Sequence, residues 1–153
     1  MTLYLFRHGD ALAKSDDATR HLSPLGIAET KRMGAWLAAH DVPAPQRVLH
    51  SGLTRAAQTA QLLADACGWP APAVAKNLTP DDDCEAWLDT LRTAKRSMAL
   101  VGHMPFMGAL TSALLCGDPG GMQVWFEKSG MAALTRVDDD GWRLLWFVAP
   151  ALV

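Results

Sequence analysis

Thr2-Leu3-Tyr4-Leu5-Phe6-Arg7-His8-Gly9-Asp10 joins a short apolar run to an Arg-His-Gly-Asp sequence. The apolar run predicts a buried β-strand over about residues 2–6, so that Arg7 and His8 lie together at its carboxyl end. Ligands bind at that edge of open α/β sheets. A neutral imidazole is a nucleophile, a guanidinium offers donors that suit phosphate, and Gly9 lets the backbone approach a ligand closely. The stretch therefore predicts a phosphate site at the end of the first strand.

The rest of the chain alternates strand-like and helix-like runs, which is typical of βαβ units and a largely parallel sheet. Ser23-Pro24 predicts the N-cap and first turn of a helix that ends before Pro43. Gly68 is well placed to end a helix over residues 54–67. Further strands are predicted over residues 46–50, 73–75, 97–101, 123–126, 131–137 and 142–148, and further helices over residues 82–93 and 106–115.

The strand-rich C-terminal part indicates a change in sheet direction. Asp140-Gly141 predicts a tight hairpin between the last two strands, which are then antiparallel. No repeat, linker or low-complexity segment interrupts the sequence, so we expect a single domain over residues 1–153. The predicted fold class is α/β, a three-layer α/β/α sandwich whose sheet is mostly parallel with an antiparallel C-terminal edge.

The composition argues against several function classes. Half of the 153 residues are apolar, and 14 basic residues are balanced by 16 acidic ones, so neither a nucleic acid nor a membrane surface is an expected partner. No apolar stretch approaches the roughly 20 residues that a membrane crossing needs, and no signal peptide opens the chain. Cys67, Cys84 and Cys116 lie 17 and 32 residues apart. This spacing predicts reduced thiols and a cytoplasmic location.

Three predicted strands end in polar residues that point to one site. The first strand ends at Arg7-His8, and the second ends at His50-Ser51, shortly before Arg55 in the first turn of a helix. His103 follows the strand over residues 97–101. The carboxyl ends of parallel strands share one edge of the sheet, so we expect Arg7, His8, Arg55 and His103 to surround one pocket. Two arginines and two histidines around one point, with helix N-termini directed at it, predict a site for a tetrahedral oxyanion.

These motifs resemble the histidine phosphatase superfamily, which has the phosphoglycerate mutase-like fold. The similar stretches, over residues 2 to about 115, are Arg7-His8-Gly9, Ser51 through Thr59, Val101-Gly102-His103 with Pro105, and Arg20 through Gly26 before the first long helix. Only 48 positions separate Arg55 from His103. They leave no room for the long lid insertion that mutases carry there. The nearest resemblance is therefore to the short, SixA-type phosphohistidine phosphatase branch.

The resemblance implies a role for each site residue. His8 is the expected nucleophile, which carries the phosphoryl group until water hydrolyses it, and Arg7, Arg55 and His103 are expected to hold the non-bridging oxygens. Gly9 and Arg20 are further expected substrate-binding residues, although Arg20 at the rim could instead pair with Asp16 or Asp17. Family members that cleave alkyl phosphates use a carboxylate after the third strand as general acid. The candidates here, among which spacing does not choose, are Asp81, Asp82, Asp83 and Glu85.

Around this site, Asp10 is expected to help position the loop of the nucleophile, His50 to be structural and Lys128 to be exposed. The predicted function is a metal-independent, cofactor-free phosphatase that hydrolyses phosphohistidine on a partner protein, either a phosphotransfer domain or a carrier. A phosphatase of small phosphate esters with the same chemistry and a phosphate-binding module without turnover are the open alternatives. A metal-dependent phosphoesterase with His8 and His103 as ligands is disfavoured, because acidic ligands at metal spacing are missing.

Overall fold

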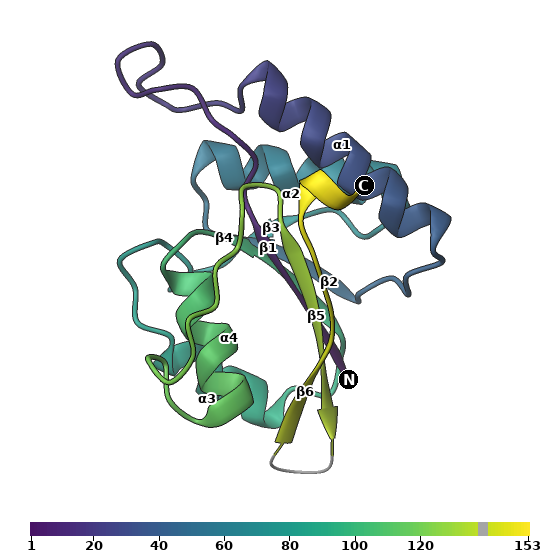
Figure 1. Cartoon of the computed structure of the whole chain (residues 1–153), viewed down its shortest axis with the longest axis vertical. Helices are drawn as coiled ribbons and strands as arrows, with labels where there is room; N and C mark the ends of the chain where they lie inside the picture. The colour runs from purple at the N-terminus through teal and green to yellow at the C-terminus, as the bar shows by residue number, and fades with distance from the viewer. Residues whose placement is uncertain (138–140) are drawn as a thin grey trace.

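A computed structural model describes residues 1–137 and 141–153 of the chain (Figure 1). Strands and helices alternate up to α4, and two strands and a short 3-10 helix follow. The elements in order are β1 (Thr2–Arg7), α1 (Pro24–Ala39), β2 (Arg47–His50), α2 (Thr54–Cys67), β3 (Ala73–Val74), α3 (Glu85–Thr93), β4 (Met98–Gly102), α4 (Phe106–Cys116), β5 (Met131–Val137), β6 (Gly141–Val148) and η1 (Pro150–Leu152).

The six strands form one mixed sheet in the order β3-β2-β4-β1-β5-β6. β1, β2, β3 and β4 are parallel to their neighbours among these four, whereas β5 is antiparallel to β1 and β6 is antiparallel to β5. This confirms the predicted mostly parallel sheet with an antiparallel C-terminal edge. The predicted hairpin turn at Asp140 lies outside the described residues.

Helices cover both faces of the sheet, α1 and α2 on one side and α3 and α4 on the other (Figure 1). The alternation of side chains along β1 shows why. Tyr4 and Phe6 pack in a core with residues of α1 and α2, whereas Leu3 and Leu5 pack in a second core with residues of α3 and α4. A parallel strand buried on both faces needs this continuous apolar run. The predicted three-layer α/β/α sandwich is confirmed.

Local signals fix the ends of the two helices beside the site. The Ser23 hydroxyl accepts a hydrogen bond from the Gly26 N–H, so Ser23 is the N-cap of α1, as predicted. Gly68 adopts the left-handed conformation, with a φ of 63°, and ends α2. No helix in the described part of the chain is long and apolar enough to span a bilayer.

One predicted strand is absent, and one predicted helix begins later than expected. Residues 123–126 form no strand, because β1 is already flanked by β4 and β5 and the segment lies against α4 instead. A Cβ on Gly108 would collide with the Val124 carbonyl, so glycine allows this close approach. α3 begins at Glu85 rather than residue 82, because the carboxylate of Asp82 accepts hydrogen bonds from Thr79 and holds a turn before the helix.

Candidate active site

The structure brings the four predicted residues together at the carboxyl edge of the sheet. In the pairing of β1 with β4, Arg7 lies opposite Gly102, so His8 and His103 follow neighbouring strands at the same level. The centroids of the two imidazole rings are 4.8 Å apart. Arg55 lies in the first turn of α2, and its Nε is 3.2 Å from His8 Nε2. The site is therefore assembled by two adjacent strand ends and one helix N-terminus.

The contacts of His8 determine which ring nitrogen carries the proton. His8 Nδ1 lies 2.7 Å from the carbonyl oxygen of Gly9. A carbonyl oxygen only accepts, so Nδ1 holds the hydrogen of the neutral ring. His8 Nε2 accepts the hydrogen bond from Arg55 Nε. The neutral ring therefore directs the lone pair of Nε2 toward the guanidinium of Arg55.

Thr59 ties the nucleophile loop to α2, a role that the sequence reasoning missed. The Gly9 N–H donates to Thr59 Oγ1 at 3.0 Å, and the same hydroxyl donates to the Arg55 carbonyl at 2.8 Å. A Cβ on Gly9 would lie 2.8 Å from Thr30 Oγ1, which is too close for a larger residue to fit without movement. Thr59 thereby couples the loop that carries His8 to the helix turn that carries Arg55.

Ser51 holds His103, and this role was also missed, although Ser51 stands in a quoted motif. Ser51 Oγ lies 2.7 Å from His103 Nε2. His103 is 1% exposed, and its Nδ1 has no hydrogen-bond partner. A hydroxyl can donate or accept, so the contact suits either form of the ring. The ring is thus fixed by Ser51 and keeps one nitrogen unpaired.

Arg7 is anchored by the segment before β5, which no sequence signal connected with the site. Its Nη1 donates to the Phe126 carbonyl at 2.6 Å, and its Cζ lies 5.3 Å from the centroid of the Trp125 ring. Burial lowers the pKa of Arg7, and Glu127 opposes this effect. The Nε of Arg7 is buried and has no partner. The segment therefore holds one edge of the guanidinium and leaves another donor free.

These unpaired nitrogens are suited to bind an anion. Among the described residues, the buried side-chain polar atoms without a partner are Arg7 Nε, His103 Nδ1 and Trp87 Nε1. Buried polar atoms normally have a hydrogen-bond partner. Two unpaired nitrogens in one cluster, Arg7 Nε and His103 Nδ1, therefore suggest a place where a ligand binds. Within the described part of the chain, neither Arg7 nor Arg55 forms an ion pair with a carboxylate. A tetrahedral oxyanion would satisfy the free donors and balance the two guanidinium charges.

Both histidines are neutral at pH 7 in this arrangement. Burial lowers the pKa of His8 to about 4, and the charges of Arg55 and Arg7 act in the same direction. Burial, followed by His8 and Arg55, lowers the pKa of His103 to about 3. A bound anion would raise both pKa values, because it favours the protonated rings.

The low pKa values predict a loss of stability in mild acid. An unfolded histidine has a pKa of about 6.5, so between roughly pH 4 and 6.5 the unfolded chain binds more protons than the folded protein. The free energy of unfolding is therefore expected to fall from pH 7 to pH 5, by about 2 kcal/mol for each of the two histidines. Urea unfolding at the two pH values measures this. His103→Gln should remove about half of the loss, and an unchanged pH dependence in this variant would contradict the assignment.

Asp10 connects three segments at the rim of the site. Its carboxylate accepts hydrogen bonds from Lys128 Nζ and Ser23 Oγ, and its carbonyl accepts from the Ser23 N–H. The hydrogen bonds from Lys128 and then Ser23 lower the pKa of Asp10. Lys128 is exposed, as expected, and its ammonium group pairs with Asp10. A Cβ on Gly26 would collide with the Asp10 backbone, so the loop lies directly on the start of α1.

Among the described residues, Arg20 forms neither of the ion pairs, with Asp16 or Asp17, that were the alternative to a role in substrate binding. Its Nε donates to the Leu12 carbonyl at 3.1 Å, and its φ is 56°. Asp17 instead pairs with His21, at 2.6 Å. The charge of Arg20 contributes to the lowered pKa of both His8 and His103, which places it near the two rings. Arg20 thus remains a proposed third cation for a substrate.

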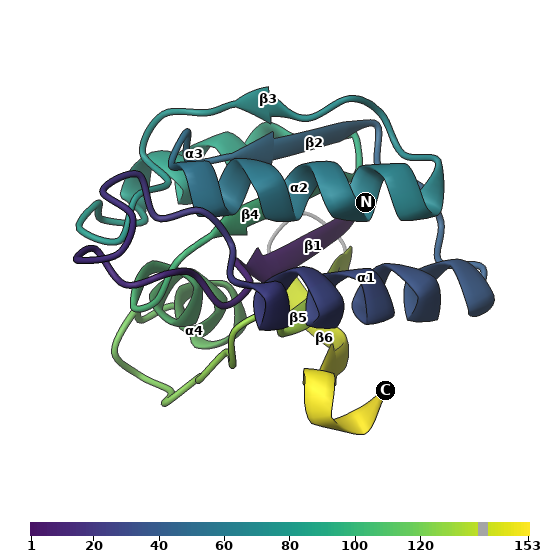
Figure 2. The same ribbon diagram turned by 90° about the horizontal axis from the view of Figure 1, so that it is seen from above.

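The four acidic candidates lie in and beside the turn before α3. The loop after β1 and the segment before α3 project from the same side of the sheet (Figure 2). The hydrogen bonds from Thr79 lower the pKa of Asp82, which keeps it ionised and disfavours it as a proton donor. Asp83 accepts from the Glu85 N–H at 3.0 Å, and Asp81, Asp83 and Glu85 are all exposed. No hydrogen bond joins any of the four to His8 or His103 in the described structure.

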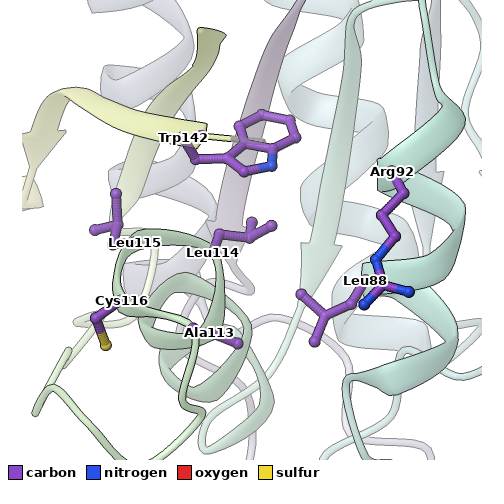
Figure 3. A pocket seen from close by; sticks show the side chains of 9 residues that line it. Leu88, Arg92, Ala113, Leu114, Leu115, Cys116 and Trp142 are labelled. Atoms are coloured by element: carbon purple, nitrogen blue, oxygen red, sulfur yellow. The ribbon is translucent and has the colours of Figure 1, made fainter. Parts of the chain in front are cut away.

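A cavity lies away from this cluster. It has a volume of about 550 Å³ between α3, the end of α4 and the start of β6, and its lining includes Leu88, Arg92, Leu114 and Trp142 (Figure 3). β6 begins beside the last residue of β5, beyond the amino end of β1, so this cavity lies at the opposite edge of the sheet. Among the described residues, no group of three or more potential metal-ligating side chains is found.

Comparison with known proteins gives consistent matches. Residues 3–79 match the histidine phosphatase superfamily, branch 1. Phosphohistidine phosphatase SixA of Escherichia coli (strain K12) is 33% identical over 156 residues, which cover 98% of this chain and 94% of that protein. An uncharacterized protein of Picosynechococcus sp. is 35% identical over 141 residues, covering 88% and 84% of the two chains. A solved structure of protein histidine phosphatase SixA complexed with tungstate has a TM-score of 0.86, with 30% identity and 99% coverage of both chains.

Proposed function

The chain belongs to the histidine phosphatase superfamily, and we propose that it is a phosphatase of phosphohistidine carried by a partner protein. The similarity to proteins named phosphohistidine phosphatase SixA supports this substrate class. We further propose that it works in the cytoplasm, where the free thiols of Cys67, Cys84 and Cys116 would stay reduced. The observation that carries the proposal is the neutral His8, whose Nε2 faces Arg55, beside the unpaired nitrogens of Arg7 and His103.

The proposed reaction has two displacements at phosphorus. His8 Nε2 forms a bond to phosphorus while the P–N bond to the substrate imidazole breaks, and the substrate imidazole leaves in its neutral form because it was protonated beforehand. Water then attacks the phosphoryl group on His8, which releases inorganic phosphate and restores the free ring. The loose transition states of phosphoryl transfer carry negative charge on the three equatorial oxygens. Arg7, Arg55 and His103 surround the position where those oxygens would lie.

The same cations support a mechanism without a metal ion. In phosphoryl transfer a metal ion neutralises charge on the phosphate oxygens. Here two guanidinium groups and the N-terminus of α2 would supply that positive potential. The leaving group also reduces the need for a general acid, since a protonated imidazole needs no further proton. Asp81, Asp83 and Glu85 are the remaining proposed proton donors for other substrates.

The short connection between Arg55 and His103 supports a protein substrate. These residues are joined by α2, β3, α3 and β4, with a turn-containing segment of about ten residues before α3. Little chain remains to build a lid over the phosphate position. A protruding phosphohistidine could therefore reach His8, whereas a small ester would gain few contacts beyond its phosphate.

The function is tested by comparing specificity constants in the presence of a metal chelator. The substrates are a phosphotransfer domain and a carrier protein, each phosphorylated on histidine with phosphoramidate, and the small esters glycerol phosphate and p-nitrophenyl phosphate. We expect kcat/KM for a phosphoprotein to exceed that for glycerol phosphate by at least about 10²-fold, because binding contacts outside the phosphate are available only to the protein. Efficient turnover of small esters alone would favour a small-molecule phosphatase. Activity that needs added zinc or magnesium would contradict metal independence.

A further inference from the structure

An apolar hollow lies at the start of α4, which follows His103 in the chain. It has a volume of about 160 Å³ and lies between the first turn of α4 and the segment before residue 125. Its walls are mainly apolar and include Met104, Pro105, Gly108, Ala109, Met122 and Val124.

The hollow adjoins the proposed chemistry on two sides. Met104 follows His103 in the chain, and Val124 precedes Trp125, whose ring lies beneath the Arg7 guanidinium. Both walls are tied to the site, because the His103 carbonyl accepts from the Met107 N–H and the Phe126 carbonyl accepts from Arg7. A protein bound through its phosphate would extend beyond the site, and the hollow lies along two of the segments that lead away from it.

The rim of the hollow exposes apolar side chains to solvent. Trp125 is 67% exposed and Met122 is 44% exposed, in a segment without regular secondary structure. Exposed aromatic and methionine side chains next to a cationic pocket are typical of a recognition surface, since they gain free energy when a partner covers them. The hollow is smaller than the 300 Å³ or more that encloses a drug-sized ligand. Its size suits a single side chain.

We propose that this hollow receives one apolar side chain of the phosphorylated protein, beside its phosphohistidine. The inference rests on the proposed function and adds a specificity determinant to it. The phosphoryl group would bind the cations, which recognise any phosphate, while the hollow would distinguish partners by the side chain next to the modified histidine. Affinity for the partner then depends on the hollow, whereas phosphoryl transfer depends on His8, Arg7, Arg55 and His103.

The test uses Met122→Ser, which removes part of an apolar wall, and Ala109→Leu, which fills the hollow from α4. The substrates are the two phosphohistidine proteins and free phosphohistidine, which has the same leaving group but no surrounding protein. We expect each variant to raise KM for a phosphoprotein about 5- to 10-fold, with kcat unchanged and free phosphohistidine turned over as by the parent. Leu145→Ser on the edge strand β6 and Ala39→Leu on α1 are the matched controls, and we expect neither to change KM.

Each other outcome has a definite meaning. If both variants keep the parental KM for the phosphoproteins, the proposal that the hollow binds a side chain is overturned. The proposed phosphatase function is then unaffected. If kcat/KM falls equally for free phosphohistidine, the substitutions act on the site or the fold, and the proposal is overturned. If kcat/KM falls only for p-nitrophenyl phosphate, the hollow binds a small substrate instead. If the parent sediments as a dimer and Met122→Ser as a monomer, the hollow binds a second copy of the chain rather than a substrate protein. If the parent turns over neither phosphoprotein, the proposed function fails and the hollow proposal fails with it.

Discussion

His8→Ala is expected to lower kcat by on the order of 10⁴-fold or more on phosphohistidine protein, because no other side chain offers a nitrogen at the position of Nε2. Arg7, Arg55 and His103 remain in this variant, so binding of inorganic phosphate or vanadate should stay measurable by calorimetry. In the parent enzyme, mass spectrometry after an alkaline quench should find a phosphoryl group on His8, since phosphohistidine is lost in acid.

His40→Ala is the matched control, because His40 is exposed at the end of α1. It should retain parental kcat and still carry the phosphoryl group on His8. Turnover by His8→Ala at the parental rate would end the covalent mechanism. Loss of both turnover and anion binding would mean instead that the substitution disrupts the site as a whole.

The sheet and the location of the site were predictable because they depend on short-range signals. An apolar run such as residues 3–6 has few ways to be buried except as a central strand, and it delivers Arg7 and His8 wherever that strand ends. Helix caps at Ser23 and Gly68 act within a few residues of themselves. The convergence of Arg55 and His103 on His8 then follows from the common direction of parallel strands.

The contacts that tune these residues were not predictable, because they join segments far apart in the sequence. The Phe126 carbonyl that accepts from Arg7 lies 119 positions away, and the apolar residues within 123–126 indicated a strand instead. The partnership of Asp10 with Lys128 spans 118 positions. Ser51 stood in a motif, but a serine hydroxyl can serve a backbone cap equally well, so only the structure shows its contact with His103.

These contacts explain how a cationic site keeps a neutral nucleophile. Each positive charge that would bind phosphate also disfavours the protonated form of His8, so the same groups serve both requirements. The Gly9 carbonyl acts in the opposite direction, since it accepts from Nδ1 and favours the protonated ring, but burial outweighs it. Arg55 has the most direct part in this balance, because its Nε donates to Nε2 itself.

Replacement of Arg55 tests this double role. Arg55→Ala should lower kcat/KM on phosphohistidine protein by about 10²- to 10³-fold, the loss typical of removing one donor that stabilises transition-state charge. Arg55→Lys should recover only part of it, because an ammonium keeps the charge but not the planar pair of donors. Arg47→Ala, at the exposed start of β2, is the control and should have no effect.

The pH dependence of the same variants separates charge from geometry. Burial is the main cause of the low pKa of His8, and the charge of Arg55 adds to it, so Arg55→Ala should raise this pKa. The acidic limb of kcat/KM, which reports protonation of the free enzyme's nucleophile, is then expected at higher pH in Arg55→Ala than in the parent. Arg55→Lys should leave the limb near its parental position, since the positive charge remains. An acidic limb that does not move in Arg55→Ala, despite the loss of rate, would show that Arg55 acts on the phosphate alone and leaves the protonation of His8 to burial.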